Sequence, residues 1–148
     1  MRILGLDYGA RTVGVAVSDP MGWTAQPLET ICRKEESKLR RTLARIEEIC
    51  REYGVEKIVI GLPLNMNDSE GERAALVRVF AEKIAARTGL PVVFEDERLT
   101  TREAEEILRE SGEPQKNWKK VIDQMAASLI LRSYMEKEAR RGENHSAW

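Results

Sequence analysis

The first third of the chain carries the hydrophobic pattern of three strands. A nearly continuous apolar run at residues 3–6 is typical of a central strand covered on both faces. Residues 13–17 alternate valine with small residues, so a second strand is expected to pair antiparallel to the first through a tight turn at Gly9. The stretch 24–31 contains Pro27, which favours an edge strand because proline cannot donate to a neighbouring strand.

Helical and strand patterns alternate through the middle of the chain. Residues 37–53 repeat apolar side chains at helical spacing and Gly54 follows, so we expect an amphipathic helix that ends there. The β-branched run 57–61 is typical of a buried parallel strand. A polar loop precedes a second helix that ends at Gly89, and the predicted inward face of this helix consists of Ala75, Leu76, Val79, Phe80 and Ile84.

The last part of the chain predicts a fifth strand at 91–94 and two further helices. The stretch TTRE at 100–103 has the pattern of a capping box, which opens a helix that Gly112 ends. Apolar spacing predicts the final helix over 119–140, and residues 141–148 are expected to form a flexible tail. This order predicts an α/β fold: a mixed five-stranded sheet, with three antiparallel strands and then two parallel ones, flanked by helices.

Composition narrows the class of protein. The 148 residues, 42% of them apolar, suit a single domain over 1–140. The 24 basic and 25 acidic residues nearly cancel, so any nucleic-acid surface has to be local. Cys32 and Cys50 lack the CxxC spacing and only one histidine is present, which disfavours a zinc site or a disulfide framework. Since no signal-peptide pattern or long apolar stretch occurs, we expect a soluble, cytoplasmic protein without membrane association.

Acidic residues stand where strands of the predicted sheet end. Asp7 follows the first strand. Glu95, Asp96 and Glu97 follow the fifth, where the pleat directs Glu95 and Glu97 to one side and Asp96 to the other. Asp123 lies on an inward row of the last helix, where a lone carboxylate is costly. Because sites in open α/β sheets form where strand ends meet, these acids are expected to converge at one edge.

The residue types in this cluster indicate a chemistry. Carboxylates without histidine or cysteine are the oxygen ligands that Mg²⁺ or Mn²⁺ prefers. Such ions activate water and stabilise the leaving oxygen of a phosphodiester, so the predicted chemistry is metal-assisted hydrolysis of nucleic acid. Each acid also has an ordinary structural interpretation. Asp7 could be a turn residue, and the strand-end acids could be solvated charges beside Arg98. Asp123 could be a helix-capping acid or could form a salt bridge with Arg98 or a lysine of the preceding loop.

Basic residues near the acids are candidate contacts for a nucleic-acid backbone. The stretch around Trp118 is basic and could combine phosphate contacts with base stacking, through Lys116, Lys119 and Lys120. A charge-rich loop of this kind is equally consistent with an ordinary solvated surface. Arg11, beside Asp7, is a further candidate, although a role in packing the hairpin fits as well, and Arg98 directly follows the strand-end acids.

Four segments, in order over residues 3 to about 135, resemble the signature blocks of the YqgF (RuvX) family: LGLDYGARTVGVAVSD, IVIGLPLNMNDSEG, DERLTTREAE and VIDQMAASLIL. The resemblance implies a ribonuclease H-like fold related to the junction resolvase RuvC. It also implies a nuclease that processes the precursor of small-subunit ribosomal RNA or resolves DNA junctions. The family's acids fall on Asp7, Glu97 and Asp123. One departure is the pair Asn67-Asp68, where the family more often has Asp-Gly, and it concerns only the geometry of that loop.

The sequence therefore predicts a metal-dependent endonuclease acting on structured nucleic acid, with Asp7, Glu97 and Asp123 as ligands of Mg²⁺ or Mn²⁺. Processing of the 5′ end of the 16S rRNA precursor is the first expectation and resolution of a four-way DNA junction the alternative. A non-catalytic module that binds RNA or the ribosome is a further alternative. An acid-bearing hairpin also opens the actin-like and sugar-kinase ATPases, but these need two such domains. The oligomeric state is left open, a homodimer included.

Overall fold

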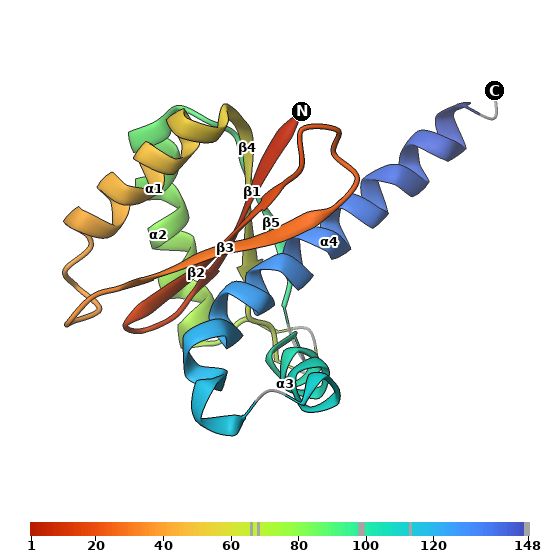
Figure 1. Cartoon of the computed structure of the whole chain (residues 1–148). Helices are drawn as coiled ribbons and strands as arrows, with labels where there is room; N and C mark the ends of the chain where they lie inside the picture. The colour runs from red at the N-terminus through yellow and green to blue at the C-terminus, as the bar shows by residue number, and fades with distance from the viewer. Residues whose placement is uncertain (66, 68, 98–99, 113, 147–148) are drawn as a thin grey trace.

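The computed structural model describes residues 1–65, 67, 69–97, 100–112 and 114–146, of which 100–102, 117, 119, 120 and 142–146 are described by their backbone alone. Its centre is one five-stranded sheet (Figure 1) of β1 (Arg2–Tyr8), β2 (Thr12–Ser18), β3 (Ala25–Cys32), β4 (Val55–Leu62) and β5 (Val92–Asp96). The strand order is β3-β2-β1-β4-β5. The pairs β1–β2 and β2–β3 are antiparallel, whereas β1–β4 and β4–β5 are parallel. The predicted mixed sheet is confirmed.

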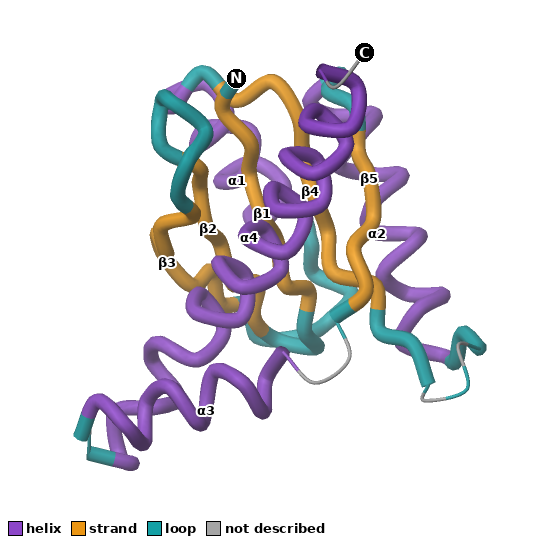
Figure 2. Tube along the Cα trace, turned by 90° about the vertical axis from the view of Figure 1, so that its right-hand side faces the viewer, coloured by secondary structure: helices purple, strands orange, loops and turns teal. Residues whose placement is uncertain are grey.

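Helices cover both faces of this sheet. They are α1 (Arg40–Tyr53), α2 (Glu72–Thr88), α3 (Thr100–Ser111), the short 3₁₀ turn η1 (Gln115–Asn117) and α4 (Trp118–Ser146). Figure 2 shows α4 crossing one face of the sheet, with α1 and α2 on the other. The helices α1 and α2 end at the predicted glycines, since Gly54 and Gly89 adopt left-handed backbone angles with φ of 63° and 72°.

The core has two layers because successive side chains of each strand point to opposite faces. One layer packs against α1 and α2 and includes Leu4, Leu6, Ile58, Ile60 and Phe80, all fully buried. The other layer packs against α4 and includes Ala16, Val59, Ala127, Ile130 and Leu131. Small residues let α4 lie close to the sheet: a Cβ on Gly5 would be 2.8 Å from Leu131 Cβ and 2.9 Å from the Ala127 carbonyl oxygen.

The predicted inward face of α2 was partly wrong. Phe80 and Ile84 are buried as expected, but Leu76 and Val79 are 42% and 48% exposed and Ala75 is exposed as well. The buried row is instead formed by Ala74, Val77, Phe80, Ala81 and Ile84. Phe80 and Ile84 belong to both rows, so the observed face differs from the predicted one mainly at its first two turns.

The final helix is longer than expected. It continues past the predicted end at Arg140 to Ser146, so its backbone occupies most of the stretch predicted as a tail. Among the described residues, no helix combines the length and apolar character that crossing a membrane requires. The single-domain interpretation stays a prediction.

Candidate active site

Asp7 lies near the end of β1, on the face that α4 covers. The strand alternation places Asp7 on the same side as Gly5, which contacts α4 directly. Across the antiparallel pairing its partner is Gly14 of β2. The Gly9 amide donates to the Thr12 carbonyl at 2.7 Å and closes the predicted turn. Asp7 is therefore held by the sheet beside that turn, and not on a mobile loop.

Glu97 lies beside Asp7 although ninety residues separate them along the chain. The Glu97 amide donates to the Leu62 carbonyl at 3.2 Å, which continues the β4–β5 pairing by one residue beyond β5. The absence of a side chain at Gly61 makes room for Glu97, because a Cβ there would be 2.7 Å from Glu97 Oε2. The carboxyl groups of Asp7 and Glu97 share a hydrogen bond. The structure thus brings these two predicted site residues together, and their role as ligands stays a prediction.

Asp123 reaches the same edge through the close packing of α4 on β2. A Cβ on Gly14 would lie 1.9 Å from the Asp123 carbonyl oxygen and 2.3 Å from its carbonyl carbon. Only glycine permits this approach, and Gly14 is also the cross-strand partner of Asp7. The carboxylate of Asp123 is near enough to raise the pKa of Asp7. Gly14 and Gly61 are therefore positioning residues that the sequence patterns did not single out.

Burial and the negative charge of neighbouring acids raise the pKa values of both Asp7 and Glu97. Burial, followed by the negative charge of Asp7 and the shared hydrogen bond, raises the pKa of Glu97 to about 9. Burial and the charge of Asp123 raise the pKa of Asp7, whereas its hydrogen bond with Glu97 opposes that rise. Both pKa values are thus raised, and a hydrogen bond between two carboxyl groups requires one proton on the pair. A cation at this point would replace that proton.

The residues fit a hard divalent cation in part. The donors are all carboxylate oxygens, the ligands that Mg²⁺ and Mn²⁺ prefer, and burial together with neighbouring negative charge raises the pKa of Asp7 and Glu97. Within the described part of the chain, however, no three His, Cys, Asp or Glu side chains are already grouped as ligands. The assembled element is thus the Asp7–Glu97 pair, with Asp123 close enough to act through its charge. A three-ligand site stays a prediction.

The other two acids at the end of β5 have different surroundings. Glu95 shares a face with Glu97, as predicted, but it is only 5% exposed and lies against α4. Its Oε1 accepts hydrogen bonds from Ser133 Oγ at 3.1 Å and from Lys137 Nζ. Asp96 contributes to the raised pKa of Glu97 through its charge. Glu95 is therefore a structural partner of α4, and Glu97 is the acid that faces Asp7.

The structure adds Arg73, which sequence reasoning missed. Its positive charge opposes the raised pKa values of both Asp7 and Glu97. Its Nη1 donates to Glu36 Oε1 at 2.6 Å, while its Nη2 is buried and has no acceptor among the described residues. Its guanidinium carbon lies 5.6 Å from the centre of the Tyr8 ring. Local sequence carries no signal for this role, because the contacts join the start of α2 to β1.

The predicted nucleic-acid contacts are spread more widely. Arg11 is exposed in the β1–β2 turn, beside Asp7, and Lys116 is exposed in η1. Arg98 lies outside the described residues, as do the side chains of Lys119 and Lys120, whose backbone forms the start of α4. None of these contacts is tested by the structure, and they stay predictions.

The chain is similar to known proteins over nearly its whole length. The family model RuvX, described as Holliday junction resolvase, matches residues 1–137. A protein of Lachnospira eligens described as "Putative pre-16S rRNA nuclease" is 61% identical over 93% of this chain and 99% of its own length. A protein of Listeria monocytogenes with the same description is 52% identical over 92% and 98%.

A solved structure supports the fold. RuvC of T. thermophilus in complex with a Holliday junction substrate superposes with a TM-score of 0.61 at 17% identity, covering 96% of both chains. At this identity the likeness concerns the fold alone, and it confirms the predicted RuvC-like architecture. With a family match over nearly its whole length and relatives more than half identical, the chain belongs to the RuvX family of nucleases.

Proposed function

We propose that the protein is a divalent-metal-dependent endonuclease that processes the precursor of 16S rRNA. The observation that carries the proposal is the proton-sharing pair of Asp7 and Glu97 at the edge of the sheet. Ionising both carboxyl groups of such a buried pair is costly without a cation, and acids with raised pKa values recur at catalytic centres. The descriptions of the close relatives supply the substrate.

Asp7 and Glu97 would hold Mg²⁺ or Mn²⁺, with Asp123 as the third ligand. When bound there, such an ion makes water a stronger nucleophile and neutralises charge on a phosphodiester. The chain's own residues do the rest. A ligand role would require both carboxyl groups to be deprotonated, and Arg73 adds positive charge beside the pair. The sheet and α4 keep the carboxylates in place before substrate arrives, which lowers the cost of assembling the site.

A second candidate function is cleavage of a four-way DNA junction. It is favoured by the description of the matching family model and by the RuvC-like fold. Membership of a nuclease family disfavours the ATPase interpretation of the hairpin. A cytoplasmic location, a homodimer and a purely RNA-binding role remain predictions.

The test is cleavage of a 16S rRNA precursor and of a four-way DNA junction, side by side, with Mg²⁺, with Mn²⁺ and with a chelator. Wild type is compared with Asp7→Asn and with Glu82→Gln, which neutralises an exposed acid of α2 as a matched control. We expect one substrate to be cut by wild type and by Glu82→Gln, and neither by Asp7→Asn nor in chelator. Equal cleavage by Asp7→Asn, or none by wild type, would refute the proposal and favour the binding role.

A further inference from the structure

The segment that joins β3 to α1 forms a basic hollow at the edge of the sheet. Its volume is about 660 Å³ and its lining includes Cys32, Arg33, Lys34, Lys38, Arg40 and Arg41. No acidic side chain is among the described residues that line it. In a chain whose net charge is −1, this is a local concentration of positive charge.

The basic hollow is attached to the turn that follows Asp7. The Arg33 amide donates to the Arg11 carbonyl at 2.8 Å, and Arg33 Nη2 donates to the Gly9 carbonyl at 2.6 Å. The Arg33 guanidinium carbon also lies 4.8 Å from the centre of the Tyr8 ring. Figure 1 shows the connection between β3 and α1 on the same side of the molecule as the β1–β2 turn. The wall of the basic hollow is therefore joined directly to the turn that follows Asp7.

The charges in the basic hollow are poorly compensated by the protein. Lys34, Arg40 and Arg41 are exposed and form no ion pair with the described residues. Of the two acids in the segment, Glu36 binds Arg73 at 2.6 Å, and Glu35 lies 4.0 Å from Lys38. Lys34, Arg40 and Arg41 are therefore available to an anionic ligand.

The start of α1 adds to this argument. Arg40 and Arg41 are its first two residues, at the positive end of the helix dipole, where cations are unfavourable. No acid stands in the first turn, and the N-cap residue Leu39 provides no side-chain hydrogen bond. The unsatisfied amides of a helix start bind phosphate well. An arrangement that is unfavourable for the helix alone becomes favourable once an anion binds.

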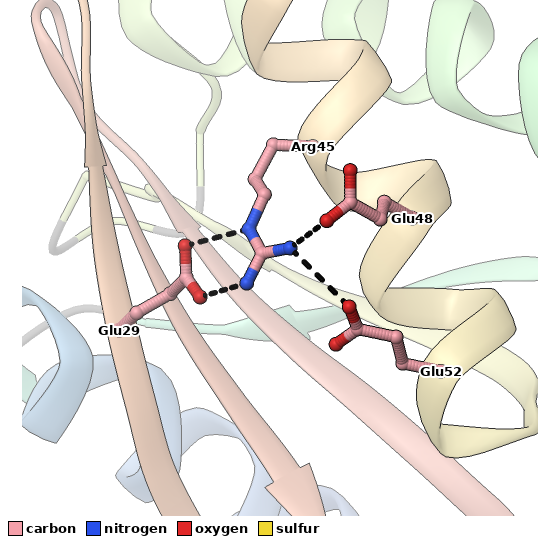
Figure 3. A network of polar contacts seen from close by, with 4 residues as sticks. All are labelled: Glu29, Arg45, Glu48 and Glu52. Atoms are coloured by element: carbon pink, nitrogen blue, oxygen red, sulfur yellow. Dashed lines mark hydrogen bonds and ion pairs between the residues drawn. The ribbon is translucent and has the colours of Figure 1, made fainter.

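A network of ion pairs joins the two elements that flank the basic hollow. Arg45 of α1 binds both carboxylate oxygens of Glu29 on β3, at 3.0 Å and 2.6 Å. The same guanidinium contacts Glu48 at 2.5 Å and Glu52 at 3.8 Å, as Figure 3 shows. This network fixes the start of α1 relative to the end of β3. A preformed site of this kind loses little conformational entropy when it binds a ligand.

We propose that the basic hollow binds the sugar-phosphate backbone of the nucleic-acid strand that passes the Asp7–Glu97 pair. The inference rests on the proposed function only in taking nucleic acid as the ligand. Its contacts are charge-based, so it carries the strand without reading the bases.

The test is binding without cleavage, in chelator, measured by fluorescence anisotropy over a series of salt concentrations. The probes are a labelled RNA hairpin with a single-stranded extension and a labelled four-way DNA junction. The variant is Arg40→Gln/Arg41→Gln, and the control Lys83→Gln/Arg140→Gln removes the same charge from exposed positions outside the hollow. We expect the melting temperature of the first variant to be no lower than that of wild type, since it removes cations from a helix start.

If two phosphate contacts are lost, the salt slope for single-stranded RNA should fall by about 1.4 and the affinity at 0.1 M salt by about 25-fold. The control should bind as wild type does. Equal affinities and slopes for the two variants would overturn the proposal, as would the absence of binding by wild type to either probe. Preference for one probe would identify the kind of strand that the hollow carries.

A second measurement reports on the basic hollow itself. Cys32 is exposed within it, whereas Cys50 is buried and burial raises its pKa to about 11, so a maleimide should react with Cys32 first. Bound nucleic acid should slow the labelling of Cys32 at least about 10-fold, in wild type and in Asp7→Asn alike. Unchanged labelling at saturation would refute the location. If wild type cleaves neither substrate but bound nucleic acid still protects Cys32, the nuclease proposal fails while the binding proposal stands.

Discussion

The replacement Gly14→Ala is the sharpest test of how the candidate site is assembled. Gly14 faces Asp7 across the β1–β2 pairing and touches the backbone of α4 at Asp123. Alanine would add one methyl group between β2 and the backbone of α4 at Asp123. The variant changes no charge and no hydrogen-bonding side chain, so any effect comes from the position of α4.

The size of the effect follows from the contact. The new Cβ would lie 1.9 Å from the Asp123 carbonyl oxygen, and ordinary contact begins at 3.4 Å, so α4 has to retreat by about 1.5 Å. Overpacking of this kind costs about 1–3 kcal/mol of unfolding free energy. A displacement of about 1 Å at a catalytic group can cost about 100-fold in rate. We therefore expect at least that loss of cleavage, with a folded protein.

The assay combines urea unfolding, Mn²⁺ titration by calorimetry and cleavage rate. Gly71→Ala is the control, because a Cβ at Gly71 would meet the Asn65 side chain at an ordinary 3.8 Å. Gly5→Ala is the second comparison, since it disturbs the docking of α4 near Leu131, farther from Asp123. Gly5→Ala should lose stability but keep more activity than Gly14→Ala.

Two results would contradict this reasoning. If Gly14→Ala matches Gly71→Ala in stability, then α4 does not pack on β2 as the structure has it. If Gly14→Ala loses stability but binds Mn²⁺ and cleaves as well as Gly5→Ala does, then Asp123 is not part of the site.

Three further predictions concern the acids and the core. Because the pKa of Glu97 rises from its ordinary 4.5 to about 9 on folding, the unfolded chain releases this proton first. The free energy of unfolding of the metal-free protein should then fall as the pH rises between these values, by up to about 1.4 kcal/mol per pH unit. Urea titrations should show that the unfolding free energy of Glu97→Gln depends less on pH than that of wild type. Cleavage assays should show Glu95→Gln near the wild-type rate, because Glu95 pairs with Lys137, whereas Glu97→Gln should lose about 100-fold or more. On α2, thermal melts should place Val79→Gln within about 0.5 kcal/mol of wild type and Phe80→Ala about 3–5 kcal/mol below it. Equal losses at these two positions would contradict the observed face of the helix.

Local patterns in the sequence determined much of the fold. The helices α1 and α2 end at Gly54 and Gly89 because a residue with left-handed backbone angles ends a helix wherever it occurs. The placement of Asp7 near a strand end was equally local, because the apolar run before it has the length of a strand. The family resemblance added the choice of Glu97, which spacing alone had left open among three acids.

Contacts between distant segments decided the rest. The pleat places Glu95 and Glu97 on one face, but only Lys137 and Ser133 of α4 show that Glu95 is a structural partner. Arg73 acts on the acids only because α2 lies beside β1 in space. The buried face of α2 likewise includes Ala74 and Ala81 and leaves Leu76 and Val79 exposed, which hydrophobicity alone does not reveal.

The same distinction applies to the glycines and the basic residues. Gly14 and Gly61 look like ordinary strand residues in the sequence, and their role emerges from what a Cβ would meet across the sheet edge. The basic hollow brings together the end of β3, the start of α1 and the turn after Asp7. Sequence determined which elements form and where the acids stand, because those depend on neighbours along the chain. Tertiary structure decided which charged side chains lie close together, because that depends on how segments distant in the sequence pack against one another.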